Sequence, residues 1–278
     1  MIETRAAART SATTAEDRMA DVWRQLGTVV DPELDESVTD MKFISRAEVD
    51  ASNCVHVDFR LPTYWCAANF AFMMADDMRT VLRALPWVKD TKIVLGEHMY
   101  ADAINTGIAE GRSFQETFGK EADGDIHEVR RTFLVKAFQR RQEALINHLI
   151  TIGMPPERIV AMTMAGLSAD AVDEEAQKLV QRYLERRDVI SSTTLASLAF
   201  VSVDDKPLQA KTLKDYLSGL RRIRANAEFN GAVCRGLLAV RFDMETPLAS
   251  KTTETCRSQA AVTGNNNTAS QQLRNVKG

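Results

Sequence analysis

The sequence predicts an α+β protein, with a small α-β-β-α-β domain followed by a mainly helical C-terminal region. Two observations indicate this. The hydrophobic period changes from two over residues 55–61 to about 3.6 over residues 70–85, which marks a strand followed by a helix. From residue 113 onwards, apolar residues recur at helical spacing between glycine and proline breaks. We therefore expect an α/β domain over residues 15–110 and a helical domain or extension over residues 111–245.

The composition is that of an ordinary globular protein. The chain has 278 residues, of which 45% are hydrophobic and 26% are charged. No apolar run is long enough to span a bilayer, and residues 1–14 lack the apolar segment of a secretory signal. The 4 cysteines include no C-x-x-C pair, so no disulfide framework is indicated and a cytoplasmic location is expected. We expect residues 1–14 and the polar residues 246–278 to be disordered.

Helix-period and strand-period segments can be placed along the chain. In the first part they follow the order helix, strand, strand, helix, strand, over residues 15–28, 38–49, 54–61, 67–85 and 88–95. Thr14 is the expected N-cap of the first helix, and Gly27 marks its end. In the second part we expect helices over residues 126–152, 169–184 and 213–223 and a short strand over residues 198–203, with residues 231–244 open between helix and strand.

Cys66 is expected in the turn between the second strand and the helix that follows it. The first amides of a helix lack backbone partners and the helix dipole is positive there, so an anion is favoured. A thiol at such a position forms the thiolate more readily, and the thiolate is the form that binds a metal or attacks an electrophile. The alternative is that Cys66 is a small buried residue without a chemical role.

Several motifs follow one another in the first domain. Residues 29–34 (Val-Val-Asp-Pro-Glu-Leu) come directly after the first helix, and Asp40 stands a few residues further on. Cys66 opens the second helix, and residues 85–93 close the domain. In this order and spacing they resemble the PaaD/SufT-like family of iron–sulfur cluster assembly factors. The resemblance covers about residues 15–100, and the rest of the chain is assigned to no family.

The sequence departs from this family in two places. The family has threonine and proline immediately ahead of a Gly-Cys-Pro turn, whereas here Pro62 and Thr63 are followed by two bulky aromatic residues before Cys66. After the third strand, residues 96–100 (Gly-Glu-His-Met-Tyr) replace the Trp-Asp-Pro-like segment of the family. The turn geometry and any ligand after the third strand therefore do not follow from the resemblance.

The resemblance implies a role in assembling iron–sulfur clusters or delivering them to recipient proteins. It implies Cys66 as the functional residue, within a motif that also includes Asp31, Pro32, Glu33 and Thr63. The protein would then be a non-enzymatic maturation factor that carries iron or an iron–sulfur cluster transiently. Its expected partners are a client iron or iron–sulfur protein, such as a multicomponent oxygenase, together with other assembly factors and a second copy of the chain.

One thiolate cannot complete a four-ligand metal site. Further ligands would come from Glu33, Asp40, Glu97 or His98, or from a second subunit or the client. Such a mixed set of sulfur, nitrogen and oxygen ligands suits iron or zinc, and a site with few ligands suits a carrier that must also release its metal. The acidic residues around Pro32 are equally well explained as turn caps.

Two other functions are consistent with the sequence. One is a thiol-dependent enzyme with Cys66 as nucleophile and His98 as base. The other is a structural interaction or chaperone module without metal, in which Cys66 is buried. Cys54 and His56 share one face of the second strand and are interpreted as ordinary strand residues. Cys234 has apolar neighbours and is interpreted as a core residue.

Binding to nucleic acid or to a membrane is not expected. The formal net charge of −3 gives no general attraction to a phosphate backbone. The acidic residues within 170–175 oppose the use of the following helix as a DNA-reading helix. The chain also lacks a glycine-rich phosphate-binding loop, which excludes the ATP-dependent class of scaffold.

Overall fold

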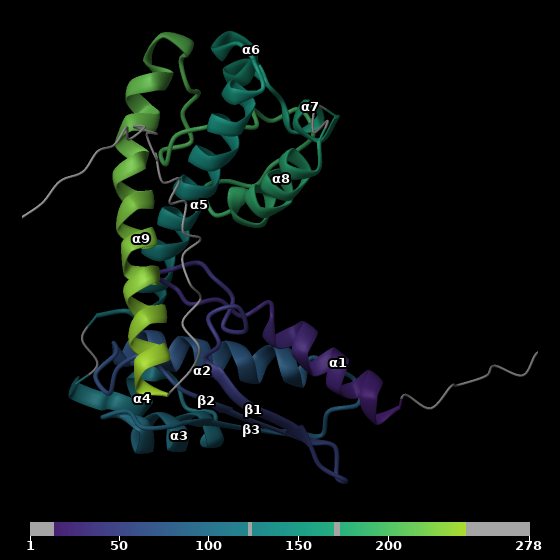
Figure 1. The fold of residues 1–278 in the computed structure, drawn as a ribbon, viewed down its shortest axis with the longest axis vertical. Coiled ribbons are helices and arrows are strands. Elements are labelled where there is room, and N and C mark those ends of the chain that lie inside the picture. The colour runs from purple at the N-terminus through teal and green to yellow at the C-terminus, as the bar shows by residue number, and fades with distance from the viewer. Residues whose placement is uncertain (1–13, 122–123, 170–172, 243–278) are drawn as a thin grey trace, which may run out of the picture. The chain divides into compact units, whose positions relative to one another are not determined.

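A computed structural model describes residues 14–121, 124–169 and 173–242, which belong to one compact unit (Figure 1). The first five elements are α1 (Ala15–Leu26), β1 (Ile44–Val49), β2 (Cys54–Phe59), α2 (Ala68–Arg83) and β3 (Asp90–Leu95). The predicted α-β-β-α-β order is therefore confirmed. Apart from Thr14, the expected disordered segments over residues 1–14 and 246–278 lie outside the described residues.

The three strands form one sheet in the order β1-β2-β3. β1 and β2 are antiparallel, and β2 and β3 are parallel because α2 crosses between them. Val55, Val57 and Phe59 on one face of β2 are fully buried in the first hydrophobic core, together with residues of α1 and α2. The intervening residues, including Cys54 and His56, lie on the opposite and more exposed face.

The observed ends of α1 agree with the capping residues predicted from the sequence, whereas the observed start of β1 differs from the prediction. Thr14 forms a reciprocal capping box with Asp17, and Gly27 follows the last turn of α1. The first strand begins at Ile44, whereas the sequence predicts it from residue 38. The prediction was too long because Lys42 has a positive φ of 57° and forms part of a turn in which the amide of Phe43 donates to the carbonyl of Val38.

Helices dominate the rest of the described chain. They are α3 (Ala101–Glu110), α4 (Phe114–Phe118), α5 (Ile126–Thr151), α6 (Pro156–Ala161), α7 (Met164–Ala169), α8 (Glu174–Arg187) and α9 (Leu213–Arg241), with short 3₁₀ turns at Gly119–Glu121 and Ala210–Thr212. The expected strand over residues 198–203 forms only isolated bridges, Thr163–Leu198 and Val201–Pro207. None of the helices within the described ranges is both long and apolar enough to cross a membrane.

α9 is a single helix of 29 residues that continues through residues 231–241, where the sequence left helix and strand open. It contacts α5 along its length, as Figure 1 shows. Its first half packs in a second hydrophobic core with α5, α6 and α8, while Leu238 is buried in the first core. Gly231 lies close to Glu36, since a Cβ atom there would be 3.4 Å from the Glu36 Oε1 atom. α9 thus joins the two cores.

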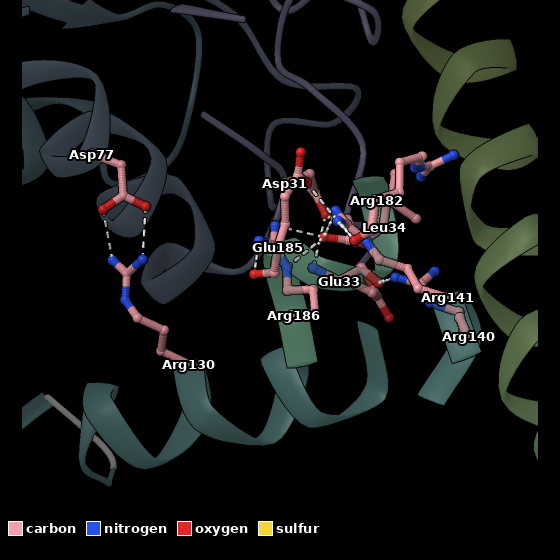
Figure 2. A network of polar contacts seen from close by, with 11 residues as sticks. Asp31, Glu33, Leu34, Asp77, Arg130, Arg140, Arg141, Arg182, Glu185 and Arg186 are labelled. Atoms are coloured by element: carbon pink, nitrogen blue, oxygen red, sulfur yellow. Dashed lines mark hydrogen bonds and ion pairs between the residues drawn. The ribbon is translucent and has the colours of Figure 1, made fainter. Parts of the chain in front are cut away.

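A buried ion-pair network connects the loop after α1 to the helical region (Figure 2). The carboxylate of Asp35 accepts from Arg141 Nε at 2.6 Å and Nη2 at 2.9 Å, and from Arg186 Nη2 at 2.8 Å. Asp35 and Arg141 are 6% and 8% exposed, so this contact is shielded from solvent. The Asp35 network therefore holds residues 31–36 against α5 and α8.

Removing one partner of the Asp35 network is expected to be costly. Arg141→Met keeps most of the aliphatic volume but leaves the buried carboxylate with Arg186 as its remaining partner. We expect the free energy of unfolding to fall by about 3 kcal/mol, measured by urea denaturation. As a control, Arg46→Met removes exposed ion pairs with Glu48 and Asp58 and should cost less than about 1 kcal/mol. Equal losses in the two variants would contradict the prediction.

Candidate functional site

The structure places Cys66 in the turn between β2 and α2, as the sequence predicts. Its side chain is half-buried, and Thr63 Oγ1 lies 3.1 Å from the Cys66 Sγ atom. The N-cap of α2, Ala67, makes no side-chain hydrogen bond, and the first turn of α2 contains no acidic residue. The first amides of α2 are therefore not capped by an anionic side chain of that turn, which favours an anion next to them.

His98 positions the turn rather than the sulfur atom. Its Nε2 atom lies 2.8 Å from the backbone carbonyl of Cys66, and its Nδ1 atom accepts from the amide of Tyr100 at 3.2 Å. These two partners assign the proton to Nε2 and leave no free lone pair on the ring. Burial lowers the pKa of His98, which keeps the ring neutral. Metal ligation by His98, or its use as a base toward Cys66, would require one of these bonds to break.

Asp31 is the most constrained of the acidic motif residues. Its Oδ1 atom accepts from the amides of Glu33 at 2.9 Å and Leu34 at 2.8 Å, so it caps the turn around Pro32. No hydrogen bond to its Oδ2 atom occurs within the described part of the chain. Burial raises the pKa of Asp31 from 3.8 to about 6. Asp31 therefore combines a structural role with a carboxylate oxygen that is free to bind a cation.

The three predicted acidic ligands lie in different environments. Glu33 is half-buried, and its Oε1 atom accepts from Asn230 of α9 at 3.0 Å. Asp40 is exposed in the turn before β1, and no polar contact connects it to Cys66 in the described residues. Glu97 is exposed and forms an ion pair with Arg241 at 3.0 Å. Of these three residues, Glu33 has the closest structural connection to the site.

The C-terminal half of α9 brings a second thiol to this region. Asn230 bonds to Glu33, and Arg241 donates to the carbonyl of Leu61 at 3.1 Å, which is five residues before Cys66. Cys234 lies between them on the helix and is half-buried against the first core. This packing agrees with the sequence-based interpretation of Cys234 as a core residue. Its approach to the Cys66 region was not predicted, and the one signal in the sequence was the four-residue spacing of Asn230, Cys234 and Leu238, which places them on one helical face.

The electrostatic environment of Cys234 includes residues of the Cys66 region. Burial is the main cause that raises the pKa of the Cys234 thiol to about 11, and Asp31, Cys66 and Glu33 contribute to the same shift. We refer to Asp31, Glu33, Cys66 and Cys234 as the thiol site.

Large apolar side chains surround the opening of the Cys66 turn. Tyr64, Trp65 and Met99 are 51%, 73% and 52% exposed. The amide of Met99 donates to the carbonyl of Tyr64 at 2.8 Å, which joins the segment after β3 to the turn. These are the two segments in which the sequence departs from the family, and here they form an exposed apolar rim.

A separate group of metal-ligating side chains lies at the β1–β2 hairpin. The ligand atoms of Asp50, Cys54 and His56 all lie within 4.8 Å of one another, and no other such group of three occurs in the described residues. Asp50 Oδ1 also accepts from the amides of Ser52 and Cys54, so this carboxylate caps the hairpin. The ligand atoms of the thiol site do not form such a group in the described residues. Metal binding there would require the side chains to move closer together, or ligands from another molecule.

Comparison with known proteins defines the class of the N-terminal region. Residues 19–95 match the family described as iron-sulfur cluster assembly protein. No curated protein and no solved structure matches the chain. The matched segment runs from α1 to the end of β3 and contains Asp31, Glu33 and Cys66, whereas Cys234 lies outside it. The N-terminal region is therefore an iron–sulfur cluster assembly domain, as the resemblance predicts, and it supports a general role in iron–sulfur cluster assembly.

The raised pKa of Asp31 predicts that Asp31→Asn increases the stability of the fold by an amount that depends on pH. Between pH 3.8 and about 6, Asp31 is protonated in the folded state and ionised in the unfolded state. Above this range Asp31 is ionised in both states, and the buried charge lowers the free energy of unfolding. Asp31→Asn keeps an oxygen for the two amides and removes that cost. We expect the variant to be more stable at about pH 7.5 by up to about 3 kcal/mol, with the gain shrinking as the pH falls through the window.

The measurement is urea denaturation of wild type and Asp31→Asn at several pH values. Asp40→Asn is the matched control because Asp40 is an exposed carboxylate in the same segment. Its effect should be small, within about 0.5 kcal/mol, at all pH values. A variant Asp31→Asn that is less stable than wild type at about pH 7.5 would show that ionised Asp31 stabilises the fold.

Proposed function

We propose that this protein is a non-enzymatic maturation factor that holds iron or an iron–sulfur cluster transiently at Cys66 and passes it to a client protein. The observation that carries the proposal is the position of Cys66. It is a partly accessible thiol at the uncapped start of α2, inside the domain that matches the assembly family. A thiolate in this position is suited to bind a soft or borderline metal.

The thiol site supplies further ligands of suitable chemistry. Cys234 offers a second sulfur, Asp31 offers its free Oδ2 atom, and Glu33 offers a carboxylate after release from Asn230. In the absence of a cation, burial keeps the Cys234 thiol protonated. A bound cation reverses this balance, because it stabilises the thiolates and the buried carboxylate and displaces their protons. A site with few protein ligands favours release to a client that offers more.

The surroundings of Cys66 support a protein as the recipient. The apolar rim of Tyr64, Trp65 and Met99 is exposed next to the turn, and aromatic residues of this kind are enriched at the centres of protein interfaces. A docking client would cover the rim and place its own ligands beside Cys66. A multicomponent oxygenase with a non-haem iron centre is one class of such a client.

Anaerobic reconstitution tests the assignment of Cys66. Purified protein is incubated with ferrous iron and sulfide, and bound iron and visible absorbance are measured for wild type, Cys66→Ser, Cys234→Ser and Cys54→Ser. We expect Cys66→Ser to lose binding at least about tenfold and Cys234→Ser to weaken it, since each removes a ligand. Cys54→Ser, the matched control at the β1–β2 hairpin, should bind like wild type.

Two outcomes would contradict the proposal. If Cys54→Ser loses iron while Cys66→Ser retains it, the metal binds at the hairpin group of Asp50, Cys54 and His56. If neither wild type nor any variant binds iron, the protein does not carry this cargo. Transfer of bound iron–sulfur cluster from wild type to an apo-protein with four cysteine ligands provides an independent readout of release.

A further inference from the structure

A second cavity, separate from the thiol site, lies where the loop after α1 meets α5, α8 and α9. Its volume is about 230 Å³. Its charged lining consists of Asp35, Glu36, Arg140, Arg141, Arg182, Arg224 and Glu228. We call this cavity the junction pocket. The lining contains four guanidinium groups and three carboxylates, and the ion pairs show which of the guanidinium groups lack an acidic partner.

The acidic residues of the junction pocket already have cationic partners. The ion pairs are Asp35–Arg141 (2.6 Å), Glu36–Arg235 (2.6 Å) and Glu228–Arg224 (2.9 Å). Asp35 also binds Arg186 at 2.8 Å, and this second cation comes from outside the pocket lining. Two further carboxylates pair with the same arginines, since Glu185 binds Arg141 at 2.6 Å and Glu143 binds Arg224 at 2.9 Å. Among the described residues, none of these carboxylates forms an ion pair with the two other arginines of the lining.

Arg140 and Arg182 are those two remaining arginines. Arg140 is half-buried, and its Nη2 atom makes one long hydrogen bond of 3.3 Å to the neutral backbone carbonyl of Glu33. Arg182 is exposed, and its guanidinium makes no hydrogen bond or ion pair within the described part of the chain (Figure 2). Burial and the charges of Arg141 and Arg182 lower the pKa of Arg140, although Asp35 and Glu36 act in the opposite direction.

We propose that the junction pocket binds a small oxyanion, with a carboxylate or phosphate group held between Arg140 and Arg182. A guanidinium presents planar N–H donors that match the paired oxygens of such groups, and partial burial strengthens the interaction. The cavity is smaller than pockets for drug-sized ligands, which measure about 300–1,000 Å³, so a small anion fits better than a nucleotide.

The proposed anion site is linked by a hydrogen bond to the turn that carries Asp31 and Glu33. Arg140 also donates to the carbonyl of Glu33, which lies two residues from Asp31. An anion that draws the Arg140 guanidinium toward itself therefore acts directly on the backbone of that turn. The proposal does not depend on the proposed function, because it rests on residues of α5 and α8 outside the thiol site.

Binding is tested by thermal unfolding and calorimetric titration of the full-length protein with sodium phosphate or sodium malonate. Sodium chloride at matched ionic strength corrects for general screening. We expect phosphate, malonate or both to raise the midpoint of unfolding beyond chloride. Arg140→Gln and Arg182→Gln should each weaken binding at least about tenfold, because each removes a charge-assisted contact. The response to the two salts identifies the group that the pocket prefers.

Arg221→Gln is the matched control, since Arg221 is an exposed arginine of α9 outside the pocket lining. It should bind the anion like wild type. Arg182 is exposed, so Arg182→Gln tests the site without risk to folding. Stabilisation no greater than that of chloride, or equal stabilisation in wild type and Arg182→Gln, would overturn the proposal.

Discussion

The arrangement of the acidic motif depends on the Asp35 network. Asp35 has a positive φ of 53° and directs its carboxylate into the helical region, where Arg141 and Arg186 bind it. A buried charge is costly unless it is paired in this way, so the contact strongly restricts the position of the loop. Asp31 and Glu33 lie on the same loop. Contacts with helices outside the matched residues 19–95 therefore help to fix their location.

The thiol site is shared between the matched domain and the helical region. The domain over residues 19–95 supplies Cys66 and the acidic turn, while α9 supplies Cys234 and the partner of Glu33. The helical region is thus more than a separate extension, because it completes the surroundings of Cys66.

Local patterns in the sequence predicted the fold well. The change of period around Cys66 located the end of β2 and the start of α2, and the capping signals located α1. The start of β1 was missed because a positive φ at Lys42 is not visible in hydrophobic periodicity. The approach of Cys234 to the site could not be predicted, because it depends on tertiary contacts between segments far apart in the chain. The hydrogen bonds of His98 were missed for the same reason.

The two sulfur atoms of the thiol site stand on different kinds of structural element. Cys234 stands on α9, a helix of 29 residues that is anchored in both hydrophobic cores. Cys66 stands on a turn, where His98 binds its carbonyl and Thr63 contacts its sulfur. A change in the distance between the two sulfur atoms would therefore come from movement of the turn. Under the proposed function, such a pair would accept cargoes of unequal diameter, from a single ion to a cluster, without repacking either core.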